Sequence, residues 1–318
     1  MITASMTQPN AESIVDSCRR NRGFSRKKPL ADVLRILGDL TFDDAGSFDS
    51  NGAKIVASTD GIVEDMVKQN PFMAGFYSVV VNVNDVVAKG AKPIGYLNVM
   101  SSPIKRNRIS MAKGIKLGLR KYDLRLLKGH VHPDQSYESI DAAVIGVANR
   151  TISSCGAKIG DEILAAIDLA GSMDSKAWVK CFDSVLKSSR KQVLRKISSM
   201  RTIAENRLAN ASRDISGPGV LGSLAMMCES SRVGARCIIE RIPRPKTVEL
   251  MDWLTAYPSI GFIVSTRKPD ECSRVFRRSG LAAATVGVVD RGREVTISYK
   301  DHNAVFLDLR SESMFGLR

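Results

Sequence analysis

One apolar segment, residues 72–89, constrains the fold of this chain more than any other part of its sequence. Its apolar side chains recur at helical spacing, it follows the step Asn70-Pro71, and Gly90 ends it. The β-branched run at 79–81 taken alone favours a strand. Asp85 lies inside the segment, where a carboxylate is costly unless it is paired or bound to a metal. The segment therefore predicts a long helix with an acidic side chain that is paired or metal-bound.

The surrounding segments alternate between helical and strand-like patterns, which predicts an α/β (α+β) fold. A length of 318 residues favours two domains over one, and we place them at residues 1–152 and 153–318. Residues 41–50 are predicted to form a polar loop. Helices are predicted at 11–38, 72–89, 109–119 and 178–210, and strands at 53–58, 94–99, 141–148, 162–169, 260–266 and 284–289.

The chain is basic, with a formal net charge of +14. Basic residues concentrate at 19–28, 105–125 and 187–207, as solvated helix faces or as a rim that attracts a phosphate compound. Aromatic residues do not alternate with them and no nucleic-acid module is present, so nucleic acid is not an expected partner. No run reaches the roughly 20 apolar residues of a membrane span. The polar start and six scattered cysteines favour a cytoplasmic protein.

Aspartates at the ends of apolar elements are the main chemical signal. Asp43 and Asp44 lie in the predicted loop, Asp60 follows a strand, and Asp85 lies in the apolar helix. Magnesium takes oxygen ligands and is commonly shared between a few carboxylates and substrate phosphates. The alternative is that single aspartates cap helices or turns. As a group they predict a magnesium site made by Asp43, Asp44, Asp60 and Asp85.

Two further segments could bind a phosphate compound. Residues 129–134 carry Gly129, His130 and Asp134, and we favour a polar loop beside phosphates over a zinc site because no third soft ligand is near. Residues 212–224 form a glycine-rich turn before a helix, which binds an anion or is simply a capped turn. Asn82 and Asn84 flank Asp85 and could hold a ribose or a metal-bound water. The predicted cofactor-binding residues are Asp43, Asp44, Asn82, Asn84, Gly129, His130, Asp134, Asp214, Ser216 and Gly217.

Five of these stretches, in this order along the chain, resemble the aminoimidazole ribonucleotide (AIR) synthase, or PurM-like, superfamily. They are Asp43-Asp44-Ala45, residues 58–61 (STDG), residues 81–93 (VNVNDVVAKGAKP), residues 129–134 and residues 214–219 (DISGPG). The superfamily includes thiamine-monophosphate kinase, selenophosphate synthase and the carbamoyl-dehydrating hydrogenase maturation factor. Residues 26–30 (RKKPL), 129–134, 213–219, 242–245 (IPRP) and 253–258 (WLTAYP) with Gly261-Phe262 resemble the AIR-synthase-related proteins called methanogenesis marker protein 2.

The resemblance implies an N-terminal domain that forms a homodimer through its strands, a C-terminal α/β domain facing it, and ATP with Mg²⁺ in the cleft. It implies metal or phosphate positions at Asp43, Asp44, Asp60 and Asp85, of which we take Asp60 and Asp85 as catalytic. Asp134 falls three residues after the aspartate of the family's GGDT motif, and Asp214 and Ser216 fall in the C-domain glycine loop. Lys89 and Lys128 replace a methionine and a glycine of the family pattern.

The expected function is that of an ATP- and magnesium-dependent enzyme that phosphorylates or activates an unknown small-molecule acceptor. The paired Cys/Sec of selenophosphate synthase and the terminal cysteine of the hydrogenase maturation factor are both missing, so neither of those reactions is expected. The alternative is a nucleotide-binding accessory protein without turnover, which the changes at Lys89 and Lys128 motivate.

Overall fold

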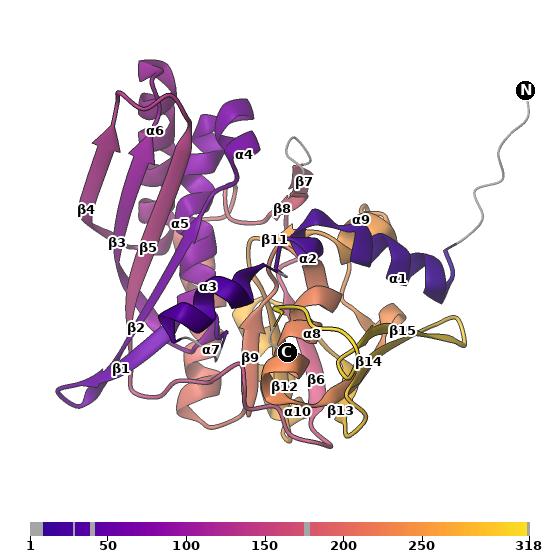
Figure 1. Ribbon diagram of the computed structural model, residues 1–318. Helices are drawn as coiled ribbons and strands as arrows, with labels where there is room; N and C mark the ends of the chain where they lie inside the picture. Colours follow the sequence, from indigo (N-terminus) through magenta and orange to yellow (C-terminus); the bar gives the residue numbers. More distant parts are fainter. Residues whose placement is uncertain (1–8, 28, 39–41, 175–178, 317–318) are drawn as a thin grey trace, which may run out of the picture.

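The computed structural model describes residues 9–27, 29–38, 42–174 and 179–316. Figure 1 shows two α/β units side by side, each built on its own sheet. We call them the N-terminal unit, from β1 to β5, and the C-terminal unit, from β6 onward. The two-domain α/β prediction is confirmed.

The N-terminal unit is a five-stranded sheet in the order β1-β2-β5-β3-β4, with only β3 and β4 parallel. Side chains alternate between buried and half-exposed along β5, because α5 and α6 cover one face of the sheet. The elements are β1 (Gly46–Ser50), β2 (Ala53–Gly61), α4 (Glu64–Gln69), α5 (Pro71–Ala88), β3 (Lys92–Ser101), α6 (Lys105–Tyr122), β4 (Arg125–His132) and β5 (Ser139–Ala148).

Helix α5 is the predicted apolar helix. Asn70 caps it by accepting a hydrogen bond from the Met73 amide at 3.2 Å, and Pro71 occupies its first turn. Burial between sheet and helices overrides the strand preference of its β-branched run. It is the one described helix long and apolar enough to cross a membrane by length and composition, and 78% of that stretch is buried inside the fold, as in a core helix.

Two glycines let α5 and α6 cross with their backbones in contact. A Cβ added to Gly75 would lie 2.1 Å from the Met111 carbonyl oxygen, and one added to Gly114 would lie 2.0 Å from that of Phe72. Any larger residue would push the helices apart. The crossing fixes α5 against the sheet, and with it the side chains that α5 presents to the C-terminal unit.

The C-terminal unit is a seven-stranded sheet in the order β15-β14-β10-β13-β6-β12-β9 beside a small sheet, β11-β8-β7. Strand β6 sends Leu164 and Ala166 into the core shared with α5, α7 and α10, and its alternate residues into a second core under α8. The elements are β6 (Glu162–Ile167), β7 (Ser172–Asp174), β8 (Cys181–Asp183), α7 (Arg190–Glu205), β9 (Ala211–Asp214), α8 (Gly219–Ser231), β10 (Gly234–Ile238), η1 (Ile239–Arg241), α9 (Leu250–Leu254), β11 (Tyr257–Pro258), β12 (Gly261–Thr266), α10 (Pro269–Ser279), β13 (Ala282–Asp290), β14 (Glu294–Tyr299) and β15 (His302–Asp308).

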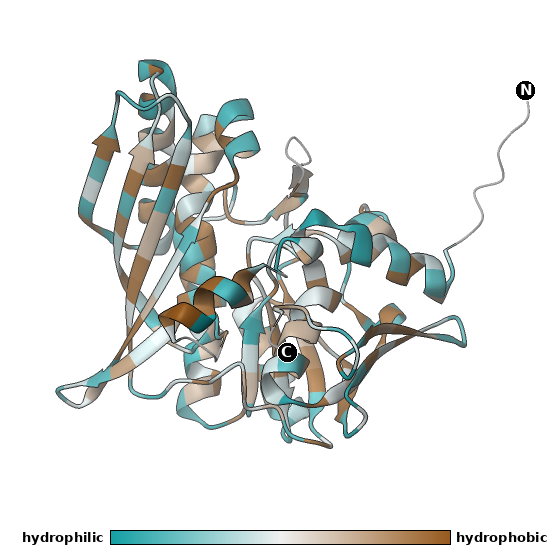
Figure 2. Cartoon of the chain, in the orientation of Figure 1, coloured by the Kyte–Doolittle hydropathy of each residue, from teal (hydrophilic) through white to brown (hydrophobic). Residues whose placement is uncertain are grey.

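The first helices of the chain pack on the C-terminal unit, although they precede the N-terminal sheet in sequence (Figure 1). The single helix predicted at 11–38 is instead three: α1 (Ala11–Arg20), α2 (Arg22–Ser25) and α3 (Leu30–Leu37). Asn21 separates α1 from α2, because its side chain caps α2 by accepting a hydrogen bond from the Gly23 amide. Pro29 precedes α3 and separates it from α2. Figure 2 shows apolar residues along α3, where Ile36 and Leu37 are exposed.

Three other local predictions were wrong. The loop at 41–50 contains β1, which pairs with β2 across a tight turn at Asn51 and Gly52, both with positive φ. The helix at 178–210 begins only at α7, where Ser189 and Gln192 form a capping box, and β8 precedes it; residue 178 lies outside the described residues. The loop predicted at 129–134 is largely strand β4.

Candidate active site

A pocket with a cavity volume of about 120 Å³, partly open to solvent, lies between the two units. The N-terminal unit lines it with the end of β2, the start of α4 and one face of α5. The C-terminal unit lines it with β8, β11 and the turn after β9, and the segment after α2 closes one side. We call it the inter-unit pocket.

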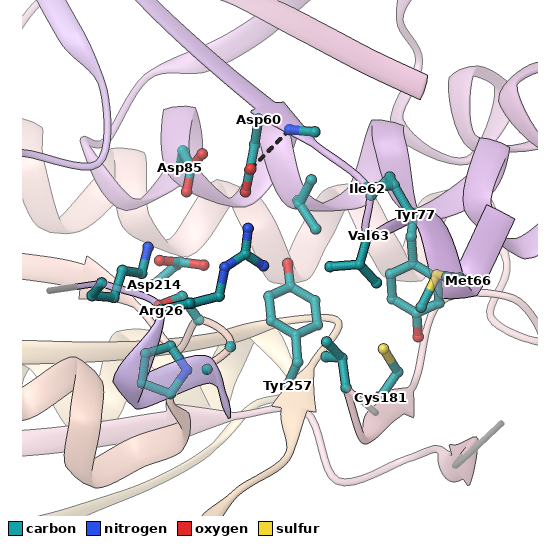
Figure 3. A pocket seen from close by; sticks show the side chains of 18 residues that line it. Arg26, Asp60, Ile62, Val63, Met66, Tyr77, Asp85, Cys181, Asp214 and Tyr257 are labelled. Atoms are coloured by element: carbon teal, nitrogen blue, oxygen red, sulfur yellow. Dashed lines mark hydrogen bonds between the residues drawn. The ribbon is translucent and has the colours of Figure 1, made fainter. Parts of the chain in front are cut away.

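Three carboxylates from different elements face this pocket. Asp60 ends β2, Asp85 projects from α5, and Asp214 ends β9 (Figure 3). Asp60 accepts a hydrogen bond from the Gly61 amide at 2.8 Å, and Asp85 accepts one from the Ser58 hydroxyl at 2.6 Å. None of the three makes an ion pair with a described residue. Asp85 thus lies in an apolar helix without a cationic partner.

The three carboxylates raise one another's cost of ionisation. Burial, and then the charges of Asp214, Asp44 and Asp60, raise the pKa of Asp85 well above its usual range. Burial and the charge of Asp44 raise the pKa of Asp214 in the same way, against the opposing effect of Arg213. Burial also raises the pKa of Asp60. No ion pair compensates these three carboxylates among the described residues, so a bound cation would lower the free energy of the cluster.

The other two predicted metal ligands already have cationic partners. Asp43 pairs with the buried ammonium of Lys89 and also accepts hydrogen bonds from the Ser153 hydroxyl at 3.1 Å and the Ser154 amide at 3.3 Å. Asp44 pairs with the Arg213 guanidinium, and one of its oxygens accepts from the Asp214 amide at 3.2 Å. Asp44 therefore belongs to the rim of the carboxylate cluster, whereas Asp43 is directed to Lys89.

Lys27 and Arg26, just after α2, line the pocket beside the carboxylates (Figure 3 shows Arg26). They act on Asp60 in the direction that lowers its pKa. Their segment is held in place by close contact of α2 with the glycine turn: a Cβ on Gly23 would lie 2.2 Å from the Gly217 carbonyl oxygen. Asn21 donates its side-chain amide to the same oxygen at 3.3 Å. Positive charge from the N-terminal segment thus reaches the pocket.

Buried oxygens without partners lie in the same region. The Asn82 side-chain oxygen and the Ser216 hydroxyl find no hydrogen-bond partner among the described residues. Because buried polar atoms are normally satisfied, such atoms fit a site that receives a ligand. No three His, Cys, Asp or Glu side chains in the described residues are spaced to hold a metal ion by themselves. Carboxylates that share a magnesium ion with substrate phosphates do not need that spacing.

Asn84 lies behind the pocket, between the two units. Its side-chain amide donates to the Tyr257 hydroxyl at 2.7 Å and to the Ser259 carbonyl at 3.0 Å. Tyr257 lines the pocket, and burial, then Asp214 and Asp85, raise the pKa of its hydroxyl. Because Asn84 donates to that hydroxyl, the tyrosine proton is available to a group in the pocket.

The pocket has one charged half and one apolar half. In Figure 3, Asp60, Asp85, Asp214 and Arg26 gather at one end, and Ile62, Val63, Met66, Tyr77 and Cys181 at the other, with Tyr257 between them. Tyr77 turns its hydroxyl away to Ser259 at 3.3 Å and Asp183 at 3.4 Å.

The segment at 129–134 does not reach the inter-unit pocket within this chain. Gly129 and His130 lie on β4, the exposed edge strand of the N-terminal sheet, and Asp134 follows in a bend. The His130 and His132 rings meet edge to face, with their centroids 4.6 Å apart. No third ligand joins them in the part of the chain that is described.

The glycine turn at 215–219 is placed beside the pocket, but three of its amides are occupied, that of Ile215 by the Gly261 carbonyl at 2.9 Å. The Ser216 amide donates to the Ser223 hydroxyl at 2.9 Å, and the Gly219 amide donates to the Ser216 carbonyl at 2.8 Å. Ser216 and Gly217 line the pocket. The roles assigned to these residues, and to Gly129, His130 and Asp134, stay predictions.

Sequence reasoning missed Arg26, Lys27, Tyr257 and the apolar half of the pocket as site residues. The two basic residues stand in a basic stretch, and Tyr257 stands in one of the stretches quoted for the resemblance. Only the docking of α2 against the glycine turn, and of β11 against α5, brings them to the carboxylates.

Comparisons with known proteins agree with the two-unit organisation. The family described as AIR synthase related protein matches with its N-terminal domain at residues 42–148 and its C-terminal domain at residues 158–300. An uncharacterized protein of Methanocaldococcus jannaschii is 31% identical over 323 residues, covering 96% of this chain and 99% of that protein. Selenide, water dikinase of Escherichia coli is 28% identical over 253 residues, covering 74% of this chain and 69% of that enzyme.

Among solved structures, AaThiL complexed with AMPPCP and TMP has a similar fold, with a TM-score of 0.67 and 19% identity, covering 92% of this chain and 96% of that one. The relatives include ATP-dependent enzymes, and the structural relative binds an ATP analogue. The matches span both units and the pocket between them. The chain belongs to the AIR synthase related, PurM-like superfamily.

Proposed function

We propose that this protein is an ATP- and magnesium-dependent enzyme that phosphorylates or activates a small-molecule acceptor in the inter-unit pocket. One observation carries the proposal: Asp60, Asp85 and Asp214, from different elements of both units, face one pocket without a cationic partner among the described residues. Polyvalent cations and phosphates satisfy such a cluster together. The AMPPCP in a structural relative of the same fold supports the choice of nucleotide.

The acidic and the basic residues of the pocket have different proposed roles. Asp60, Asp85 and Asp214 would hold magnesium, which supplies neutralisation of charge on the phosphates. Lys27 and Arg26 lie where they can attract the phosphate oxygens, and the Ser216 hydroxyl, which lines the pocket, can donate a hydrogen bond to them. Asp44 keeps the Arg213 guanidinium beside the cluster. The catalytic contribution of the chain is then positioning and electrostatic stabilisation.

The test compares nucleotide binding and ADP formation in wild type, Asp85→Asn and Asp49→Asn. Asp49 is an exposed aspartate on β1, paired with Lys54 at 2.8 Å, and serves as the matched control. We expect Mg²⁺-dependent binding of ATP in wild type and in the control, and its loss in Asp85→Asn. Equal binding by all three proteins would refute the site.

Turnover distinguishes the enzyme from an accessory protein. The pairing of Lys89 with Asp43 favours the accessory alternative in one respect, because it removes one carboxylate from the metal set. ADP formation stimulated by an acceptor supports the enzyme. Tight binding of ATP without ADP formation, over a broad panel of acceptors, supports the accessory role.

We also propose that the protein works as a homodimer through the open face of the N-terminal sheet. Helices cover only one face, and on the other Val99 and Leu127 are 42% and 51% exposed. An apolar face of this kind marks an interaction surface. Sedimentation of wild type should give a dimer, and Val99→Lys should give a monomer; a monomeric wild type would contradict the proposal.

A further inference from the structure

The apolar half of the inter-unit pocket has a composition that selects its occupant. Ile62, Val63 and Met66 line it, together with Val179 and Cys181. None of these side chains is charged, whereas the other half holds Asp60, Asp85, Asp214, Arg26 and Lys27. An acceptor that occupies the apolar half beside a nucleotide in the charged half must therefore have an apolar body and a reactive polar group at the boundary between them.

Three hydrogen bonds already occupy backbone groups around the apolar half. The Ile62 amide donates to the Ile140 carbonyl at 3.0 Å, and the Val63 carbonyl accepts from the Met66 amide at 3.0 Å. The Tyr257 amide donates to the Lys180 carbonyl at 2.7 Å. An adenine ring placed here would leave its amino group and ring nitrogens without these partners, which is costly in a buried site. A ring without polar atoms at its far edge carries no such cost.

Tyr257 stands where the two halves meet. Its ring contributes to the apolar side, and its hydroxyl, which accepts from Asn84, has a proton to donate toward the charged side. The apolar half offers no charged side chain to pair with an ionised group, so a neutral hydroxyl suits this place better than an anion. The tyrosine can orient such a hydroxyl by a hydrogen bond.

Resting on the proposed function, we propose that the acceptor is a small uncharged alcohol with an apolar ring body, which fills the apolar half and presents its hydroxyl at Tyr257. In the transfer, the acceptor oxygen forms a bond to the γ-phosphorus of ATP as the bond from that phosphorus to the bridging oxygen breaks. ADP leaves with the electron pair of that bond, and the hydroxyl proton passes to water at the pocket mouth.

The experiment uses benzyl alcohol as the probe and glycerol as its polar counterpart, with the full chain, by ligand-observed NMR titration. Titrations are made with and without AMPPCP and Mg²⁺. Val63→Phe fills the apolar half without adding charge, and Val305→Phe, at a 46% exposed valine on β15, is the matched control. Circular dichroism checks that each variant is folded.

We expect wild type and the control to bind benzyl alcohol in preference to glycerol, and Val63→Phe to bind it at least about tenfold more weakly. AMPPCP affinity should stay the same in all three. If Val63→Phe does not fold, Met66→Ala replaces it, and the enlarged pocket should shift the preference toward 2-naphthylmethanol.

Two results would overturn the inference: unchanged benzyl alcohol binding in Val63→Phe, or glycerol binding as strongly as benzyl alcohol. If Met66→Ala is used, an unchanged preference between benzyl alcohol and 2-naphthylmethanol would also overturn the inference. Failure of wild type to bind AMPPCP with Mg²⁺ would instead overturn the proposed function. In that case the alcohol could no longer be assigned as a phosphoryl acceptor. The nucleotide titration separates the two failures.

Discussion

The ion pair between Lys89 and Asp43 gives the sharpest stability prediction. Both side chains are nearly buried, with 4% and 12% of their surface exposed. Lys89→Met leaves a buried carboxylate without its cation. Removing one partner of a buried pair costs about 3–5 kcal/mol. Asp43 keeps its hydrogen bonds from Ser153 and Ser154, so we expect the lower end, about 3 kcal/mol.

Chemical and thermal denaturation at pH 7 measure this loss. At roughly 2–4 °C per kcal/mol, the midpoint of thermal unfolding should fall by roughly 6–12 °C. Lys54→Met is the control, because its pair with Asp49 is exposed and should contribute under about 1 kcal/mol. A loss below about 1 kcal/mol in Lys89→Met would refute the assigned role of the pair.

The same variant has a predictable pH dependence. Burial acts to raise the pKa of Asp43, but the Lys89 charge and the hydrogen bonds outweigh it, so the pKa lies below the usual value. A carboxylate with a lowered folded-state pKa stabilises the fold above its unfolded pKa, and this contribution is lost as the pH falls through the folded pKa. The gap between wild type and Lys89→Met should therefore narrow below about pH 4. If Asp43 is also a metal ligand, Mg²⁺ with nucleotide will stabilise Lys89→Met more than wild type.

Three further predictions concern the pocket. Asp85→Asn should raise the midpoint of thermal unfolding of the ligand-free protein at pH 7, because it removes a carboxyl group whose ionisation is opposed by burial and by neighbouring carboxylates. The same variant should lose the stabilisation that Mg²⁺ with ATP gives to wild type. A lower midpoint would contradict the like-charge cluster. Tyr257→Phe should lower acceptor-stimulated ADP formation by about tenfold with unchanged nucleotide affinity, and no change would exclude the hydroxyl from the reaction. Gly23→Ala should cost about 1–3 kcal/mol and weaken nucleotide binding, because its Cβ collides with Gly217 and displaces the segment bearing Lys27; wild-type behaviour would show that this contact is adaptable.

Periodicity and punctuation predicted the elements whose burial is one-sided or continuous. The alternation along β5 survives in the structure because one of its faces meets the core, and the continuous apolar character of α5 matches a helix that is buried on nearly all sides. Boundaries between elements that depend on a single residue were harder to predict. Asn21 divides a run that is helical by composition, and the Asn51-Gly52 turn converts a polar stretch into a hairpin. Asn21 and the Asn51-Gly52 step are both visible in the sequence, but the average character of the residues around them favours a continuous helix and a loop.

The candidate site was predictable only in part, for a physical reason. Asp60 and Asp85 stand out because carboxylates beside apolar runs need compensation. Whether an aspartate still lacks a cationic partner in the folded protein depends on contacts between residues far apart in sequence. Lys89 neutralises Asp43 across 46 positions, and Arg213 neutralises Asp44 from the other unit. Tyr257 enters the pocket only because Asn84 holds its hydroxyl from the opposite unit.

Anomalous diffraction from crystals grown with AMPPCP and Mn²⁺ in place of Mg²⁺ tests the central claim most directly. The account predicts a manganese peak in the inter-unit pocket, bonded to oxygens of at least one of Asp60, Asp85 and Asp214 and to the terminal phosphate at about 2.0–2.3 Å. The terminal phosphate should face Tyr257 and the apolar half. Nucleotide bound elsewhere, or manganese bound away from all three carboxylates, would contradict it.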